Sequence, residues 1–122
     1  MDDFWKLFES LGYLHDSVVE RLTWTPEAGT LELAIEDFYS NFDGLPEYPG
    51  RLAGSITLRG IETIDLDIDF GAERLNIDEF VVESDPSGVL ILQLKFWPRG
   101  RIDAKFGSID LPQLVVPGQV DR

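Results

Sequence analysis

The adjacent residues His15 and Asp16 have the chemistry needed for general base catalysis, because a carboxylate can orient an imidazole that accepts a proton. Neighbours in sequence rarely reach that geometry. A zinc site could use only this histidine and carboxylates, since the chain has no cysteine and no second histidine. The structural interpretation is that His15, Asp16 and Ser17 close a helix-to-strand connection through hydrogen bonds between side chains and backbone. We expect this structural role, with no catalytic residue, metal site or cofactor.

A second candidate is the alternating row Asp65, Asp67 and Asp69, whose carboxylates share one face of a predicted strand. Alternate residues of a strand stand about 6.5 Å apart, whereas calcium needs six to eight oxygens within about 2.6 Å, so a preformed cation site is not expected. A row of like charges opposes folding unless cations lie beside it or a partner covers it. Four of the ten basic residues fall in the last predicted hairpin: Lys95, Arg99, Arg101 and Lys105. A charge-paired sheet face and a partner-binding face therefore both stay open.

Aromatic residues gather in the segment 38–52, whose prolines and glycines predict a long loop. They are Phe38, Tyr39, Phe42 and Tyr48. Such side chains can stack on a sugar or form the apolar centre of a protein interface, and long loops are commonly functional. They can equally plug the end of a β-sandwich, so the pattern predicts either a binding loop or a structural plug.

A short helix is predicted at the N-terminal side of these candidate functional residues. Apolar residues Phe4, Leu7, Phe8 and Leu11 follow the spacing of a single helical stripe, which predicts a helix over about 3–11. Asp2 or Asp3 suits its N-terminus. The apolar stripe should lie on a sheet.

From about residue 18 to about residue 110 the apolar period is two, which predicts strands joined by turns. The alternation changes phase near Asp78-Glu79, which indicates a bulge. We predict a mainly β (α+β) domain spanning 1–122: an antiparallel sandwich or rolled sheet of about seven strands, one N-terminal helix, and a loose tail over about 112–122.

The charge of the chain limits its partners. With 10 basic and 23 acidic residues the formal net charge is −13, so its field repels nucleic acids and anionic membranes and attracts a basic protein. The surplus acid could also serve solubility alone. The N-terminus is acidic where a signal peptide needs cations, and no apolar run reaches the roughly 18 residues that span a bilayer, so we expect a cytoplasmic protein.

Two short motifs carry a family resemblance: Leu14-His15-Asp16-Ser17 at the first predicted turn, and Leu58-Arg59-Gly60-Ile61 before the aspartate row. With the strand LELAI between them, they resemble a pattern of small, uncharacterised, β-rich bacterial proteins, among them immunity proteins of polymorphic toxin systems. The resemblance covers about the first two thirds of the chain. It implies a compact β-rich fold and neutralisation of a toxin by binding, without chemistry.

The sequence therefore predicts a non-enzymatic protein-binding module, in the form of an acidic immunity protein that neutralises a basic toxin. Glu32 and Glu36 join the aspartate row in steering the partner, while Tyr39, Phe42 and Tyr48 supply apolar anchors. The alternatives are a small-ligand or carbohydrate-binding β-sandwich that uses the loop aromatics, and a metal-dependent enzyme that uses His15 and Asp16. The oligomeric state is left open.

Overall fold

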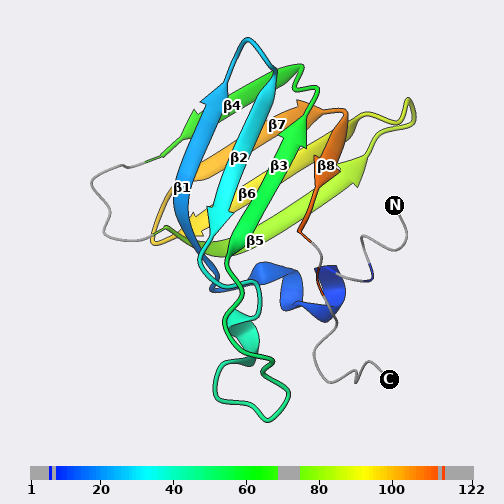
Figure 1. Cartoon of the computed structure of the whole chain (residues 1–122). Coiled ribbons are helices and arrows are strands. Elements are labelled where there is room, and N and C mark those ends of the chain that lie inside the picture. The colour runs from blue at the N-terminus through cyan, green and yellow to red at the C-terminus, as the bar shows by residue number, and fades with distance from the viewer. Residues whose placement is uncertain (1–5, 7, 69–74, 113, 115–122) are drawn as a thin grey trace.

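The computed structural model describes residues 6, 8–68, 75–112 and 114, and within them eight strands form one antiparallel sheet (Figure 1). The strands are β1 (Val18–Thr25), β2 (Thr30–Ile35), β3 (Gly54–Arg59), β4 (Thr63–Asp67), β5 (Leu75–Ser84), β6 (Leu90–Trp97), β7 (Arg101–Phe106) and β8 (Ser108–Asp110). Their order in the sheet is β4-β7-β6-β5-β1-β2-β3-β8. The mainly β class predicted from the alternating pattern is confirmed.

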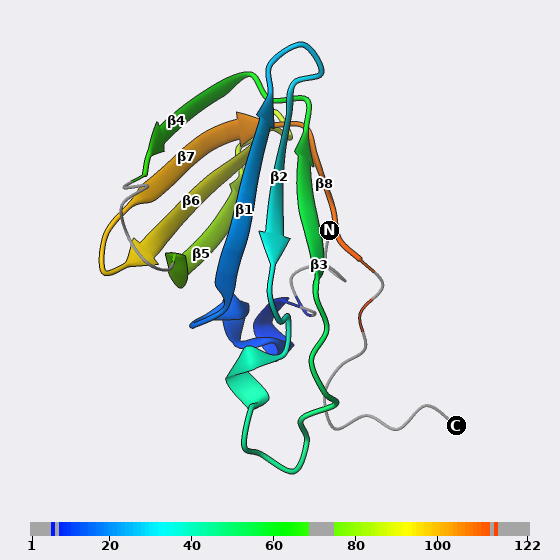
Figure 2. The ribbon, with the colours of Figure 1, turned by 60° about the vertical axis from the view of Figure 1, so that its left-hand side comes forward.

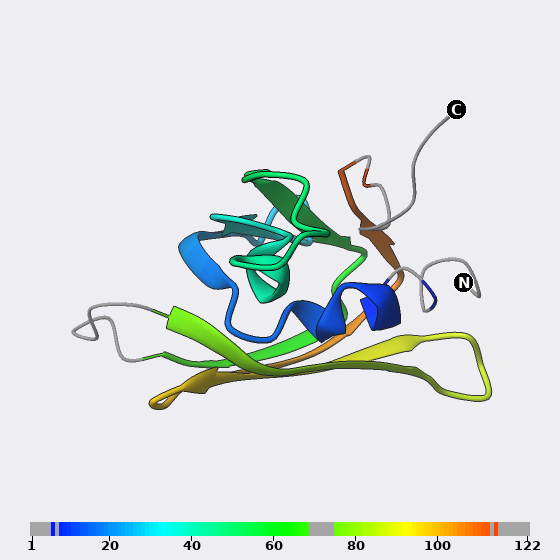
Figure 3. The same cartoon turned by 90° about the horizontal axis from the view of Figure 1, so that it is seen from below.

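The sheet is rolled into two layers. Figures 2 and 3 show β4, β7, β6 and β5 as one layer and β1, β2, β3 and β8 as the layer facing it. Among the residues that the structure describes, β1 and β5 join the layers through two residue pairs, Val18 with Asn76 and Val19 with Leu75. Beyond these pairs the two strands diverge, which leaves room for a core between the layers.

A glycine corner closes the opposite side of the roll. The backbone N–H of Gly107 donates to the carbonyl of Arg59 (2.9 Å), and the N–H of Glu62 donates to the carbonyl of Lys105 (2.8 Å). The β3–β4 and β7–β8 segments thus pass from one layer to the other side by side. Gly60 has φ +67°, a left-handed conformation that side chains other than glycine's rarely adopt. The corner therefore depends on glycine at this position.

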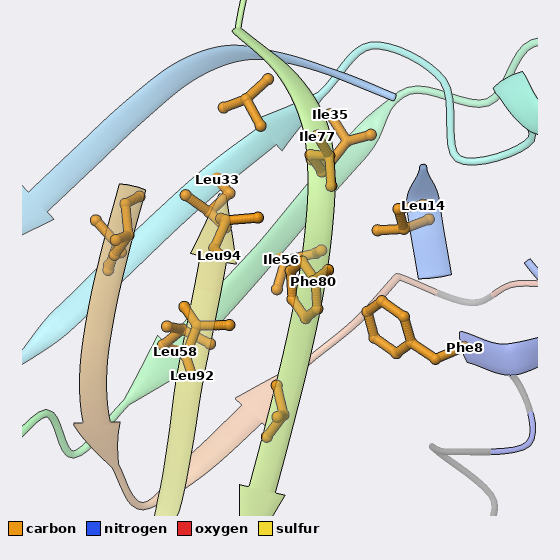
Figure 4. Close-up of a cluster of buried hydrophobic side chains, with 14 of the residues drawn as sticks. Phe8, Leu14, Leu33, Ile35, Ile56, Leu58, Ile77, Phe80, Leu92 and Leu94 are labelled. Atoms are coloured by element: carbon orange, nitrogen blue, oxygen red, sulfur yellow. The ribbon is translucent and has the colours of Figure 1, made fainter. Parts of the chain in front are cut away.

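The core is built from the facing sides of both layers, as Figure 4 shows for Leu33 and Leu58 opposite Leu92 and Leu94. Residues 6 and 8–10 are helical and lie at one end of the roll, where the Phe8 ring stacks on Phe80 with centroids 4.7 Å apart. Leu11 and Leu14 are buried there too. The N-terminal helix thus closes the core, as its apolar stripe predicted, although residues 3–5 and 7 of its predicted range lie outside the described residues.

Several local predictions can be compared with the structure. The register shifts between Ile77 and Glu79, which confirms the bulge expected near Asp78-Glu79. Trp97 is 66% exposed and lies on the same outer face of β6 as Gln93 and Lys95. A loose tail was predicted from about residue 112, but Leu114 packs against the core. Residues 113 and 115–122 of the predicted tail lie outside the described residues.

Because the core side chains are fully buried, we expect the free energy of unfolding to depend strongly on their size. Leu92→Ala removes a side chain with 0% exposure and should lower the free energy of unfolding by about 2–5 kcal/mol, because it leaves a cavity. The matched control is Leu66→Ala on β4, where the side chain is 40% exposed and the loss should be below about 1 kcal/mol. Urea unfolding of both variants measures the difference, and equal losses would contradict this account of the core.

Candidate functional site

The loop after β2 is organised by the carboxylate of Asp37. Its Oδ1 accepts hydrogen bonds from the backbone N–H of Tyr39 (2.9 Å) and of Leu52 (3.1 Å), at the two ends of the loop. Its Oδ2 accepts a 2.5 Å hydrogen bond from the Tyr48 hydroxyl. One side chain thereby holds three points of the segment 38–52 and gives a long loop a defined shape.

The same loop is tied to the N-terminal part of the chain. Ser17 is fully buried, and its hydroxyl donates to the Asp37 carbonyl (3.2 Å) and contacts the Ser40 hydroxyl (2.8 Å). The Asn41 amide donates to the carbonyl of Leu11 (2.9 Å), where the helical segment ends. These bonds satisfy polar groups that the packed segments would otherwise leave without partners.

The loop aromatics form a plug. Phe38 and Tyr39 are 1% and 3% exposed, and Phe42 and Tyr48 are partly buried against the same core. Tyr39 therefore cannot act as the exposed anchor that the sequence suggested. The Tyr48 hydroxyl already binds Asp37, which agrees with a structural plug. Stacking on a sugar would need exposed rings, whereas these four rings are buried or partly buried.

His15 and Asp16 take structural positions. His15 Nδ1 lies 3.0 Å from the carbonyl oxygen of Asp78, while its Nε2 is 3.7 Å from the Asp16 carboxylate, too far for a hydrogen bond. The Asp16 backbone N–H donates to the Ile77 carbonyl (2.8 Å). Together with the Ser17 bonds, these contacts close the connection into β1 and tie it to the start of β5.

The aspartate row lies beside the basic hairpin. Asp65 and Asp67 on β4 stand opposite Asp103 and Arg101 on β7, and the Arg101 guanidinium lies 3.6 Å from Asp65 and 3.5 Å from Asp103. This is the charge-paired sheet face that the sequence left open. Asp69 falls outside the described residues.

The remaining predicted steering residues lie elsewhere. Glu32 is on β2, in the other layer, where its carboxylate is 3.9 Å from Arg21. Glu36 follows β2, and its carbonyl accepts a hydrogen bond from Arg51 Nε (3.3 Å). The seven predicted partner-binding residues that the structure describes therefore do not gather on one surface.

A groove that the sequence did not predict runs along β5. It has a volume of about 600 Å³. Its lining comes from two segments, Gly12, Tyr13 and His15 on one side and residues 78–83 on the other. Tyr13 is 46% exposed and Val81 is 37% exposed, so apolar surface is open to solvent here. Two sequence signals lie close to this groove, namely His15 in its lining and the change of phase at Asp78-Glu79.

Much of the positive charge in the described residues is used within the chain. Ion pairs with carboxylates involve Arg21, Arg51, Arg59, Lys95 and Arg101. Because acidic residues outnumber basic ones by 23 to 10, an excess of carboxylates is left over. Exposed acidic residues include Asp16, Asp78, Glu79 and Glu83 at or near the groove. The field at this surface is therefore negative.

No protein-family model matches the sequence, and the search of curated proteins gave no match. The resemblance to immunity proteins thus stays a prediction. Among the described residues, no group of three or more potential ligands is placed to hold a metal ion. Within the same residues, no helix has the length and apolar character needed to cross a membrane.

The hydrogen bond from Tyr48 to Asp37 predicts an unusual titration of this tyrosine. The hydrogen bond to Asp37, with burial and the negative charge of that carboxylate, raises the pKa of Tyr48 from 10.0 to about 12. Because the folded-state pKa lies above the unfolded value, the contribution of this group to stability is complete below pH 10 and is lost as the pH rises toward about 12. Ultraviolet titration of the wild type should show a tyrosinate step near pH 12, which Tyr48→Phe removes. Tyr13→Phe, at an exposed tyrosine, is the control and should leave that step in place.

Proposed function

We propose that this protein is a non-enzymatic binding protein whose partner is a basic protein. The observation that supports this proposal is the distribution of charge: five of the described cations lie in ion pairs, while acidic residues outnumber basic ones by 23 to 10. Complementary potentials accelerate the encounter with a cationic partner and discriminate against anionic ones. Nucleic acids and anionic membranes are disfavoured for the same reason.

The arrangement of the candidate catalytic residues supports the non-enzymatic part of this proposal. His15 and Asp16 are not hydrogen-bonded to each other, and His15 lies against a backbone carbonyl. The loop aromatics, which a carbohydrate site would need exposed, are packed against the core. In its most specific form the proposal is that of an acidic immunity protein that covers the basic surface of a toxin, as the two short sequence motifs suggest.

Affinity capture from a lysate of the source organism tests this proposal. At about 0.1 M salt the Debye length is about 10 Å, and at about 1 M it is about 3 Å, so a charge-steered complex should form at the lower salt and weaken at the higher one. We expect one basic protein to be enriched at low salt and depleted at high salt, with identification by mass spectrometry. The purified partner should then show a dissociation constant that rises with salt in calorimetric titrations.

Two results would contradict the proposal. One is recovery of no protein at either salt concentration, which would leave the charge as a solubility device. The other is a partner whose dissociation constant is unchanged between the two salt concentrations, since binding would then not depend on the acidic surface.

A further inference from the structure

Strand β4 lies at a free edge of the sheet. It pairs with β7 on one side and comes first in the sheet order, so no strand in the described part of the chain pairs with its other side (Figure 2). The strand at the opposite edge of the sheet, β8, spans only Ser108–Asp110, whereas β4 has five residues. The longer free edge therefore belongs to β4.

The hydrogen bonds of β7 show which way its backbone groups point. The Phe96 N–H donates to the Gly100 carbonyl (2.9 Å), in the register of the β6–β7 ladder. The Lys105 carbonyl instead accepts a hydrogen bond from the Glu62 N–H (2.8 Å), just before β4. Residues bonded to one neighbour alternate along an antiparallel strand. Even-numbered residues of β7 therefore bond to β6, and odd-numbered residues bond to β4.

The same alternation determines the direction of the backbone groups in β4. Asp65 and Asp67 pair with odd-numbered residues of β7, so their N–H and C=O groups bond to that strand. The N–H and C=O groups of Ile64 and Leu66 point the opposite way, into the free edge. Leu66 is 40% exposed and Ile64 is only partly buried. Solvent also reaches this strand from a hollow of about 220 Å³ that Thr63, Ile64 and Asp65 help to line.

The two faces of β4 differ in chemistry. Ile64 packs against the core, and Leu66 shares its face because side chains alternate along a strand. Asp65 and Asp67 point to the outer face, where the Asp65 side chain is 65% exposed although it lies 3.6 Å from Arg101. A segment laid along the free edge would therefore meet apolar surface on its inner side and carboxylates on its outer side.

Charge selects the occupant of this edge. Two copies of β4 paired edge to edge would bring Asp65 and Asp67 of one chain close to those of the other, within chains of formal net charge −13. Like charges on neighbouring strands are destabilising, which disfavours a second copy. Basic side chains in the same places would be attracted by these carboxylates.

We infer that the β4 edge is the docking site for an extended segment of the basic partner in which basic and apolar residues alternate, and which adds to the sheet as a further antiparallel strand. Main-chain hydrogen bonds to Ile64 and Leu66 hold the segment. Its apolar residues cover Leu66, and its lysine or arginine residues lie beside Asp65 and Asp67. This inference rests on the proposed function and assigns it a surface.

A synthetic peptide tests the strand addition directly. The probe is a capped peptide of alternating lysine and valine. Residues directly opposite each other in antiparallel strands share one face, so the valines lie opposite Ile64 and Leu66 and donate their N–H groups to them. N-methylation of the valine amides should weaken binding about tenfold, through the loss of two or more hydrogen bonds. N-methylation of the lysine amides, which face away from β4, is the matched control and should leave the affinity unchanged in calorimetric titrations.

Hydrogen exchange measured by nuclear magnetic resonance locates the added strand. In the free protein the amides of Ile64 and Leu66 should exchange faster than that of Asp65, because only Asp65 bonds to β7. With the unmodified peptide at about ten times its dissociation constant, exchange at Ile64 and Leu66 should slow about tenfold. The Asp65 amide should keep its rate.

Matched variants separate the backbone contribution from side-chain packing and charge. Leu66→Pro removes an N–H that β7 does not use, at an edge position where proline is tolerated, and should abolish peptide binding. Leu66→Ala keeps this N–H and should weaken binding by no more than about threefold. Asp67→Asn should weaken binding about threefold. Glu47→Gln, which removes the same charge in the loop 38–52 at the other end of the roll (Figure 1), should not.

The outcomes distinguish the inference from the proposed function. Equal binding of the three peptides, or equal weakening by the two methylations, would overturn strand addition while leaving a basic partner intact. Weakening by lysine methylation alone would overturn the antiparallel arrangement. Self-association of the protein that Leu66→Pro abolishes would overturn the basic occupant in favour of a second copy. If Leu66→Pro fails to fold, the methylated peptides still decide, and absence of binding by the unmodified peptide overturns the inference whatever the lysate capture yields.

Discussion

The hydrogen bonds accepted by the Asp37 carboxylate hold together the end of the roll at which the loop 38–52 meets the N-terminal helical segment. A loop of this length would be costly to order, because each fixed residue loses backbone freedom. Asp37 holds both ends of the loop and the Tyr48 hydroxyl, and its own carbonyl receives the buried Ser17 hydroxyl. The plug of aromatics, the turn that carries His15 and the wall of the β5 groove are all positioned through this one residue and its neighbours.

The order created at that end has a consequence for the sheet. The loop and the helical segment fill the space where β1 and β5 diverge, so the core is closed there by side chains such as Phe8 and Leu14 instead of by strand pairing. Phe80 and Val82 on β5 are nearly fully buried there, with 2% and 3% of their surface exposed.

The sequence predicted those parts of the fold that depend on periodicity. Strands such as β2 and β6 were visible because burial on one or both faces imposes a period of two, and the bulge at Asp78 was visible because it changes the phase. Other features depend on contacts between distant segments and carry no local signal. The local sequence does not distinguish Asp37 from any other loop aspartate. Its role becomes visible only when the fold brings Leu52 and Tyr48 next to it. The groove arises where two strands separate in space, which no single segment encodes.

The glycine corner determines when the molecule can become complete during synthesis. Arg59 and Gly107 meet there, so the two layers cannot close on each other until the chain as far as Gly107 has left the ribosome. The β1, β2 and β3 strands, which follow one another along the chain, can pair earlier, but their leucine-rich inner side has nothing to cover it. The nascent protein therefore passes through a stage with an uncovered apolar sheet, during which its dense negative charge provides the repulsion that keeps unfinished chains apart.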